Sequence, residues 1–183
     1  MNKWTRRAFL AGAGTSVAAC GNGIGNNRGS RIDYRVDLAL NQMYDEVPGS
    51  RDLADRAVGM LVMPTVTKAG FGWGGAYGEG ALLIGGAPVD YYSIAQGSWG
   101  FQLGLQQYAH TLFFMNENAL SDFRSSAGWQ VGADAEYVLK NQGDSIGIDS
   151  TKLRSPVIAV IFGRAGLQVG ATLAGTKYSR IIR

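Results

Sequence analysis

The sequence predicts an α+β fold in which two N-terminal helices precede a large antiparallel β-sheet or barrel-like sandwich, with one short helix inserted near residues 118–126. Two observations support this prediction. Apolar residues recur at helical spacing before residue 59 and mostly at alternate positions after it. Glycine accounts for 27 of 183 residues, about twice its average usage, and in strands it marks bulges, barrel corners or close backbone approach. Adjacent strands behind a helical segment are typical of the α+β class.

Two stretches at the start of the domain predict helices. The first is apolar on one side and polar on the other, and its apolar residues are Ile32, Val36, Ala39, Leu40, Met43, Tyr44 and Val47. A Pro-Gly pair at 48–49 ends it. Ser50 is a candidate N-cap for the second helix, with Asp52 in its first turn. The short inserted helix has its apolar residues at Ala119, Leu120 and Phe123.

The rest of the domain is predicted to form strands. The segments with an alternating or continuous apolar pattern cover residues 60–66, 71–77, 81–84, 91–96, 101–105, 111–115, 129–137, 157–162 and 167–173. Pro64 lacks a backbone N–H group, so the first segment is expected to be an edge strand or to contain a bulge. No internal repeat of the kind that builds a solenoid or propeller is visible in the sequence.

The start of the chain resembles a bacterial twin-arginine lipoprotein signal. Arg6 and Arg7 precede an apolar run over residues 8–19, and small residues lead up to Cys20. The run is shorter than the ~20 residues that cross a bilayer. Cleavage before Cys20 would let its thiol carry a diacylglyceryl group; an ordinary secretory signal with a chance cysteine is the alternative. The chain is thus divided into a signal peptide, a lipidated cysteine with a flexible tether, and one domain: 1–19, 20–30 and 31–183.

Charge and cysteine content exclude several classes of protein. The signal segment holds three basic residues and no acidic one, so the remainder carries 14 basic and 14 acidic side chains. A balanced surface of this kind gives no overall basic field for nucleic acid. With Cys20 lipidated, no thiol remains for a disulfide, a redox pair or a thiolate metal site.

The residue types that carry catalysis are scarce, so we expect no enzyme, no cofactor and no metal site. His110 is the single histidine, and the sequence contains no GxSxG motif to provide a nucleophile beside it. We expect it to be a loop or strand-edge residue. Asp134 and Glu136 are two residues apart on a predicted strand, which is typical of a solvated face. Residues 170–177 lack the order of a Walker loop, because threonine precedes lysine there.

A candidate lipid-binding group remains. Lys68 lies just before a Gly-rich segment that contains Phe71 and Trp73, and Lys177 and Arg180 lie near the last strands. Cationic side chains beside Gly-rich backbone can bind phosphate headgroups. The alternative, which spacing alone favours, is that the aromatic residues belong to the core and the basic residues are solvated.

The order of several short segments resembles the SYLF domain, in the form of its bacterial lipoprotein branch of the Burkholderia type. The segments that carry the resemblance are 59–64, 68–72, 75–80, 91–93, 100–104, 113–115, 119–123, 132–134, 166–170 and 173–177. Together they cover about residues 35–183. The basic residue that the family commonly has in its first Gly-rich hairpin is replaced here by Ala76 or Tyr77.

This resemblance implies lipid binding, although not the phosphoinositides that eukaryotic SYLF proteins bind. The expected function is that of a membrane-anchored bacterial lipoprotein with a non-catalytic lipid-binding domain, held by acyl chains such as palmitate on the periplasmic side of the outer membrane. Gly21 follows the cysteine and gives no aspartate-type retention signal for the inner membrane. The expected partners are membrane lipids, with anionic phospholipid headgroups as the candidate class. The alternative is a structural or protein-interaction lipoprotein with an envelope protein as its partner.

Overall fold

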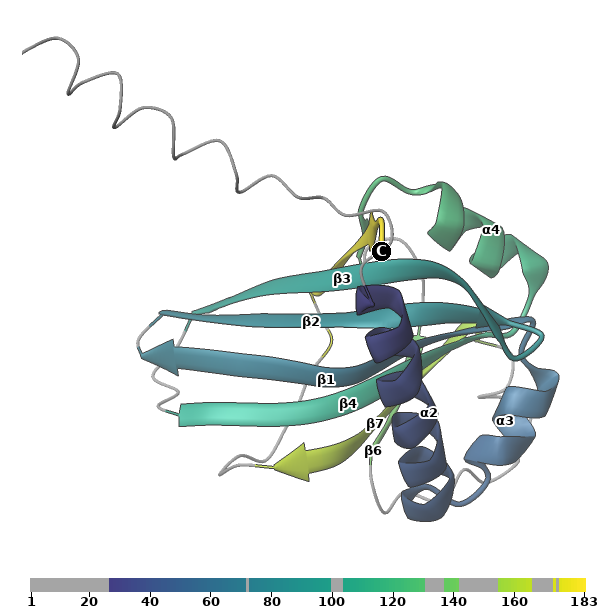
Figure 1. Ribbon diagram of the computed structural model, residues 1–183, viewed down its shortest axis with the longest axis horizontal. Helices are drawn as coiled ribbons and strands as arrows, with labels where there is room; N and C mark the ends of the chain where they lie inside the picture. Colours follow the sequence, from purple (N-terminus) through teal and green to yellow (C-terminus); the bar gives the residue numbers. More distant parts are fainter. Residues whose placement is uncertain are drawn as a thin grey trace, which may run out of the picture.

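The computed structural model describes residues 27–71, 73–99, 104–130, 137–141, 155–165, 173 and 175–183. Within these residues it confirms the predicted α+β fold: helices precede a strongly curled sheet, and one short helix is inserted later in the chain (Figure 1). Arg6, Arg7, Cys20, Asp134 and Glu136 lie outside the described residues.

The helices are α2 (Arg28–Glu46), α3 (Ser50–Arg56) and α4 (Glu117–Ser125). Helix α2 begins inside the segment assigned above to the tether, and its first turn closes through a bond from Arg31 N–H to the Asn27 carbonyl. Ser50 does not cap α3, contrary to the prediction: Gly49 occupies that position, and the Ser50 hydroxyl donates to the Met43 carbonyl. Asn116 caps α4 by accepting from Ala119 N–H at 2.9 Å.

The strands of the described residues form one eight-stranded sheet with the order β5-β8-β3-β2-β1-β4-β7-β6. Every neighbouring pair is antiparallel except β6 and β7, which are parallel. The strands are β1 (Gly59–Phe71), β2 (Trp73–Ile84), β3 (Ala87–Trp99), β4 (Gly104–Phe114), β5 (Trp129–Gln130), β6 (Tyr137–Asn141), β7 (Val157–Ala165) and β8 (Lys177–Ile181).

One strand prediction near the end of the chain is wrong, and another lies almost entirely outside the described residues. The single strand expected over 129–137 is instead two strands, β5 and β6, at opposite edges of the sheet. The described C-terminal strand is β8, which begins after the segment 167–173 where the last strand was expected. Most of that segment lies outside the described residues.

Pro64 lies at a bulge in β1, as the first of the strand predictions allowed. The register with β2 shifts between Val62 and Thr65, and the register with β4 shifts between Met63 and Val66. Next to the bulge, a Cβ atom on Gly78 would lie 2.7 Å from the Thr65 carbonyl oxygen. Only glycine permits β2 to approach β1 this closely, and the local bend adds to the curl of the sheet.

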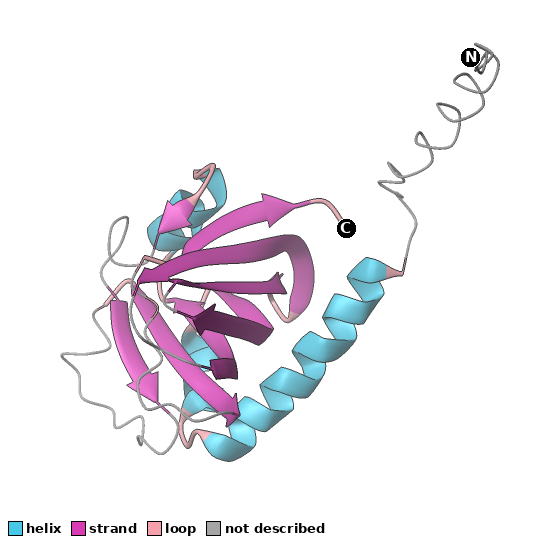
Figure 2. Ribbon diagram, turned by 90° about the vertical axis from the view of Figure 1, so that its left-hand side faces the viewer, coloured by secondary structure: helices cyan, strands magenta, loops and turns pink. Residues whose placement is uncertain are grey.

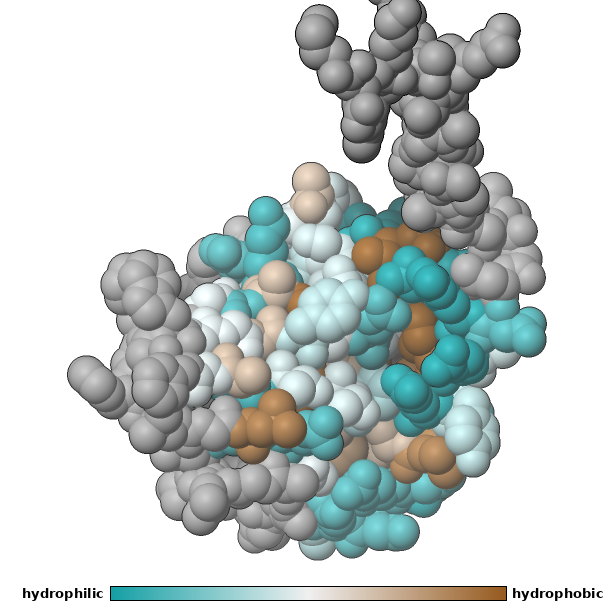
Figure 3. Space-filling view, turned by 60° about the vertical axis from the view of Figure 1, so that its left-hand side comes forward, coloured by the Kyte–Doolittle hydropathy of each residue, from teal (hydrophilic) through white to brown (hydrophobic). Residues whose placement is uncertain are grey.

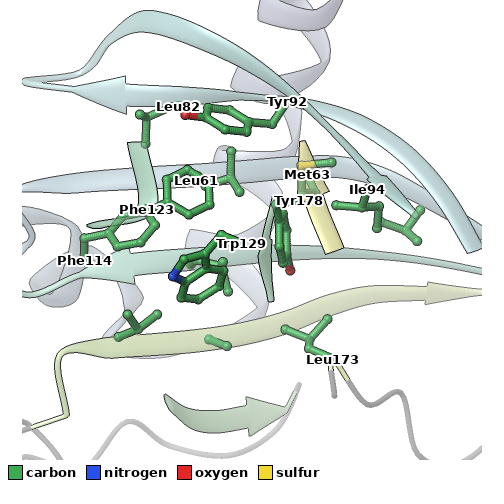
Figure 4. Packing of buried hydrophobic residues seen from close by; sticks show 14 of the residues in the cluster. Leu61, Met63, Leu82, Tyr92, Ile94, Phe114, Phe123, Trp129, Leu173 and Tyr178 are labelled. Carbon is green, nitrogen blue, oxygen red and sulfur yellow. The ribbon is translucent and has the colours of Figure 1, made fainter. Parts of the chain in front are cut away.

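The curled sheet has a hydrophobic cluster on each face. The outer core lies between the helices α2 and α3 and the convex face, and consists of Ile32, Val36, Ala39, Met43, Val47, Leu53, Met60, Val62, Ala81, Leu83, Ala109, Phe113, Ile158, Val160 and Phe162. The inner core fills the concave face beneath α4 (Figure 4) and includes Leu61, Met63, Val66, Ala76, Leu82, Tyr92, Ile94, Tyr108, Leu112, Phe114, Phe123, Trp129, Leu173 and Tyr178.

Helix α2 crosses the outside of the sheet obliquely and is fixed at both ends (Figure 2). Near its N-terminus, the Tyr91 hydroxyl of β3 donates to the Asp33 carboxylate at 3.1 Å. Near its C-terminus, Gly163 N–H of β7 donates to the Glu46 carboxylate at 2.9 Å. Strands β1 to β4 extend well beyond the helix on one side (Figure 1), so part of the convex face there is left uncovered by α2.

Candidate functional site

A groove opens where the helix leaves the extended strands. It has a volume of about 630 Å³, and α2 borders it with Ile32 and Arg35. The residues of β1 and β2 that line it are Pro64, Thr65, Thr67, Ala69, Gly75, Ala76, Tyr77, Gly78 and Glu79. A volume of this size lies within the range of small-molecule sites.

The bulge at Pro64 determines which side chains face this groove. Before the bulge, Met60 and Val62 of β1 point into the outer core under α2. The bulge adds one residue to β1 and so shifts by one position which of its side chains lie on the outer face of the sheet. After the bulge, Thr65 and Thr67 are the residues on that face. The register places Thr65 opposite Glu79 and Thr67 opposite Tyr77. The apolar surface under the helix therefore gives way to hydroxyl groups, one carboxylate and one aromatic ring.

The charged groups of the groove are arranged with Arg35 on the helix and Glu79 on the sheet. Glu79 accepts hydrogen bonds from the Tyr77 hydroxyl and from Arg183 Nη2, each at 2.6 Å. The bond to Arg183 lowers the pKa of the Glu79 carboxyl, and the bond to Glu79 raises the pKa of Tyr77. Arg35 is exposed and forms no ion pair with any residue that the structure describes.

The surface beside the groove is amphiphilic. On α2, Tyr34 and Leu38 are 66% and 52% exposed, and Arg31 is exposed between them and the N-terminus of the helix. Figure 3 shows a central area of intermediate hydropathy bordered by hydrophilic side chains, with separate hydrophobic residues among them. This mixture is suited to a ligand or surface that offers both polar and apolar groups.

The structure does not bring the predicted lipid-binding residues together. Lys68 pairs with Ala76 and shares the concave side of the sheet with Val66 of the inner core. Lys177 is exposed. It directly precedes Tyr178, which is buried in the inner core, so the side chains of these two residues point to opposite faces of the sheet. The two lysines therefore lie on opposite faces, with β3 and β2 between their strands.

Phe71 and Trp73 pair at the tip of the β1–β2 hairpin, but their side chains lie outside what the structure describes.

Arg180 has a partner inside the protein. It forms an ion pair with Asp90 of β3, whose side chain is only 4% exposed, and Arg124 of α4 pairs with the same carboxylate at 3.1 Å. A buried carboxylate requires such compensation. Arg180 thus helps to attach β8 to β3, and Arg124 helps to attach α4 to the same strand.

We expect the substitution Arg180→Gln to lower the free energy of unfolding by at most about 1 kcal/mol, since the arginine is largely exposed and Arg124 still pairs with Asp90. Urea unfolding of the two single variants and of the double variant Arg124→Gln/Arg180→Gln measures this. The double variant should lose more stability than the sum of the single variants, because it leaves the carboxylate buried without a partner. If the losses of stability in the two single variants simply added up in the double variant, Arg124 and Arg180 would not share the compensation of Asp90.

His110 is not the loop or strand-edge residue that the sequence predicted. It lies within β4, between β1 and β7, and is fully buried. Its Nε2 atom is 2.8 Å from the Tyr178 hydroxyl. Burial lowers the pKa of the imidazole to about 3, so it is neutral at physiological pH. Burial also raises the pKa of Tyr108, two residues away on the same face, to about 12.

Metal binding and membrane spanning by a helix are two further properties to consider for the described part of the chain. Within it, no group of three or more histidine, cysteine, aspartate and glutamate side chains is placed to hold a metal ion. No helix in that part is both long and apolar enough to span a bilayer.

The sequence analysis missed the residues that form the groove, namely Arg35, Thr65, Thr67, Tyr77 and Glu79. One signal was present: Pro64 indicated a bulge, and the alternating threonines after it are typical of a strand face that has left the core. Which face they occupy became clear only from the register.

Comparison with known proteins supports the SYLF resemblance over part of the chain. Residues 95–180 match the Ysc84 family, described as "Las17-binding protein actin regulator". The matched segment begins in β3 and ends in β8, whereas the groove is built from residues that precede it. No curated protein matches the chain.

Proposed function

We propose that this protein is an exported, membrane-anchored bacterial lipoprotein whose domain binds phospholipid headgroups without catalysing a reaction. The observation that carries the proposal is the groove, in which an exposed arginine without an ion-pair partner among the described residues, an exposed tyrosine ring and threonine hydroxyls lie beside an amphiphilic helix face. Phosphate headgroups are bound by such combinations of cationic and hydroxyl donors. The match of residues 95–180 to a family with lipid- and actin-associated members is consistent with this proposal.

The position of the groove in the chain supports the same proposal. A lipidated Cys20 would precede α2 by a segment that spans at most about 25 Å when fully extended. The N-terminal half of α2, with Arg31, Tyr34 and Arg35, would then be held close to the bilayer surface. We propose the periplasmic side of the outer membrane as its location, because Gly21 supplies no inner-membrane retention signal.

The lipid-binding proposal predicts a loss of vesicle affinity when Arg35 is replaced by glutamine. A basic residue near an anionic surface contributes roughly 1 kcal/mol, so we expect about fivefold weaker binding at low salt. Flotation of the purified full chain carrying Cys20→Ala with phosphatidylglycerol-containing vesicles provides the measurement, since this background removes the acyl chains.

The matched control is Arg56→Gln, which removes an exposed arginine of α3 that does not line the groove. Its vesicle affinity should remain that of the parent protein. Equal losses of vesicle affinity for both variants would show that only the overall charge of the protein matters. If the parent protein does not bind the vesicles at all, the proposal is wrong.

A second candidate function is protein interaction, which the description of the matched family as a Las17-binding protein favours. The exposed Tyr34 and Leu38 of α2 offer a surface for such a partner. A photoreactive residue at position 38 would separate the two candidates in intact cells. One dominant protein adduct would favour protein interaction, and lipid adducts would favour the first proposal.

A further inference from the structure

We propose that the groove selects a zwitterionic phospholipid headgroup with a primary ammonium beside its phosphate, that is, the headgroup of an aminophospholipid. This inference rests on the proposed function and specifies the ligand of the same groove. The proposed headgroup differs from the anionic headgroups that the sequence suggested. The inference follows from the presence of both an acidic and a basic side chain in the lining of the groove.

The two walls carry opposite charges. Arg35 borders the groove from α2, and Glu79 lines it from β2. Arg183, which pairs with Glu79, does not line the groove. Arg183 pairs with Glu79, and Arg28 is a further positive charge acting on it, so the carboxylate is partly compensated. A purely anionic headgroup could use Arg35 but would offer no donor to the remaining acceptor positions of Glu79. A headgroup with one charge of each sign satisfies both walls.

Glu79 has remaining capacity to accept hydrogen bonds. The Tyr77 hydroxyl and Arg183 Nη2 both donate to its Oε1 atom. Among the residues that the structure describes, no other side chain donates a hydrogen bond to its Oε2 atom. An ionised carboxylate offers about four acceptor positions over its two oxygens, and a primary ammonium carries three donors. Oε2 can therefore receive a ligand ammonium while the contacts at Oε1 are kept.

Tyr77 adds a second contact for a cation. Its side chain is 56% exposed, and its hydroxyl is held by Glu79, so the ring is kept beside the carboxylate. A cation over a tyrosine face is attracted by the ring quadrupole. The carboxylate and the ring thus form one cation-binding side of the groove.

The neighbouring strand suits a phosphate. Thr65 and Thr67 of β1 are the cross-strand partners of Glu79 and Tyr77, and Arg35 borders the same groove from α2. The Cβ atoms of directly paired residues on adjacent strands lie roughly 5 Å apart. A phosphate and an ammonium on one short headgroup can therefore contact the threonine hydroxyls and the Glu79 carboxylate at once.

The test measures binding of soluble short-chain lipids to the full chain carrying Cys20→Ala, by isothermal titration calorimetry. The probes are dihexanoyl phosphatidylethanolamine, phosphatidylcholine and phosphatidylglycerol. We expect the ethanolamine lipid to bind at least about fivefold more tightly than the glycerol lipid. It should also bind more tightly than the choline lipid, because a trimethylammonium cannot donate a hydrogen bond to Glu79.

Glu79→Gln should abolish this preference while leaving the glycerol lipid bound as well as before or better. The matched control is Asp37→Asn, which makes the same charge change on an exposed residue of α2 outside the groove and should keep the preference. Tyr77→Leu provides a second variant if Glu79→Gln fails to fold, and it should weaken the ethanolamine lipid more than the glycerol lipid.

The outcomes are distinct. Equal or tighter binding of the glycerol lipid by the parent protein would overturn this inference and leave the proposed function standing. A preference that survives both Glu79→Gln and Tyr77→Leu would also overturn it. If none of the three lipids binds and vesicles are not bound either, the proposed function fails together with the inference.

Discussion

Replacing Cys20 with alanine is expected to move the protein from the membrane fraction to the soluble fraction, or to leave it as the uncleaved, longer form. The physical reason is that the proposed acyl chains would contribute about 0.8 kcal/mol for each buried CH₂ group. Several long chains together exceed by far the few kcal/mol that a groove and a few basic residues can add. The anchor should therefore dominate membrane association in the cell.

Fractionation of intact cells, followed by electrophoresis, measures this effect. Cys20→Ser, which keeps a small polar side chain but no thiol, should behave like Cys20→Ala. Unchanged membrane association and mobility of both variants would contradict lipidation at this residue. Weak residual association that disappears at high salt would instead match the groove, because contacts with a charged surface are screened by salt.

The helical part of the fold was predictable because its burial pattern is regular. Ile32, Val36, Ala39 and Met43 recur on one side of α2, and all four are buried in the outer core. The earlier start of the helix at Arg28 was not predictable from that pattern, since its first turn carries no apolar residue. Its closure depends on a backbone bond to Asn27.

The strands were predictable where the alternation is long, and not where it is short. β8 has five residues, of which only Tyr178 is buried. A single buried residue gives no periodicity, so the sequence pattern does not predict a strand over 177–181. Its pairing with β3 and β5 is determined by long-range contacts of Tyr178 with Trp129 and Phe123.

The groups named for the candidate site in the sequence and the groups that line the groove in the structure are of the same types, but they are different residues. The sequence suggested that a cation, an aromatic residue and Gly-rich backbone would meet, and named Lys68 and Lys177 as the cations. In the structure, Arg35, Tyr77 and the Gly-rich part of β2 meet instead. The bulge at Pro64 is the cause, because a shift of one residue moves every later side chain of β1 to the other face. Lys68 is consequently turned to the concave side.

His110 leads to the remaining prediction, which concerns stability against acid. In the unfolded chain its pKa should lie near 6.5, whereas burial lowers it to about 3 in the folded protein. Between these two values the unfolded chain binds a proton that the folded protein does not. The free energy of unfolding must therefore fall as the pH decreases from about 6.5 toward 3.

We expect this single group to remove about 3 kcal/mol of stability between pH 7 and pH 4, as the two pKa values require. Aspartate and glutamate side chains in general also titrate toward the acidic end of this range, so the effect has to be isolated by comparison with His110→Gln. Glutamine cannot titrate, but its amide can still reach the Tyr178 hydroxyl that His110 Nε2 contacts at 2.8 Å. Urea unfolding of both proteins at pH 7 and pH 4 gives the required difference.

The His110→Gln variant should be less stable than the parent protein at pH 7, yet its free energy of unfolding should fall by about 3 kcal/mol less on acidification. Equal losses in the two proteins would mean that His110 is protonated without unfolding, and that the inner core can accommodate its charge.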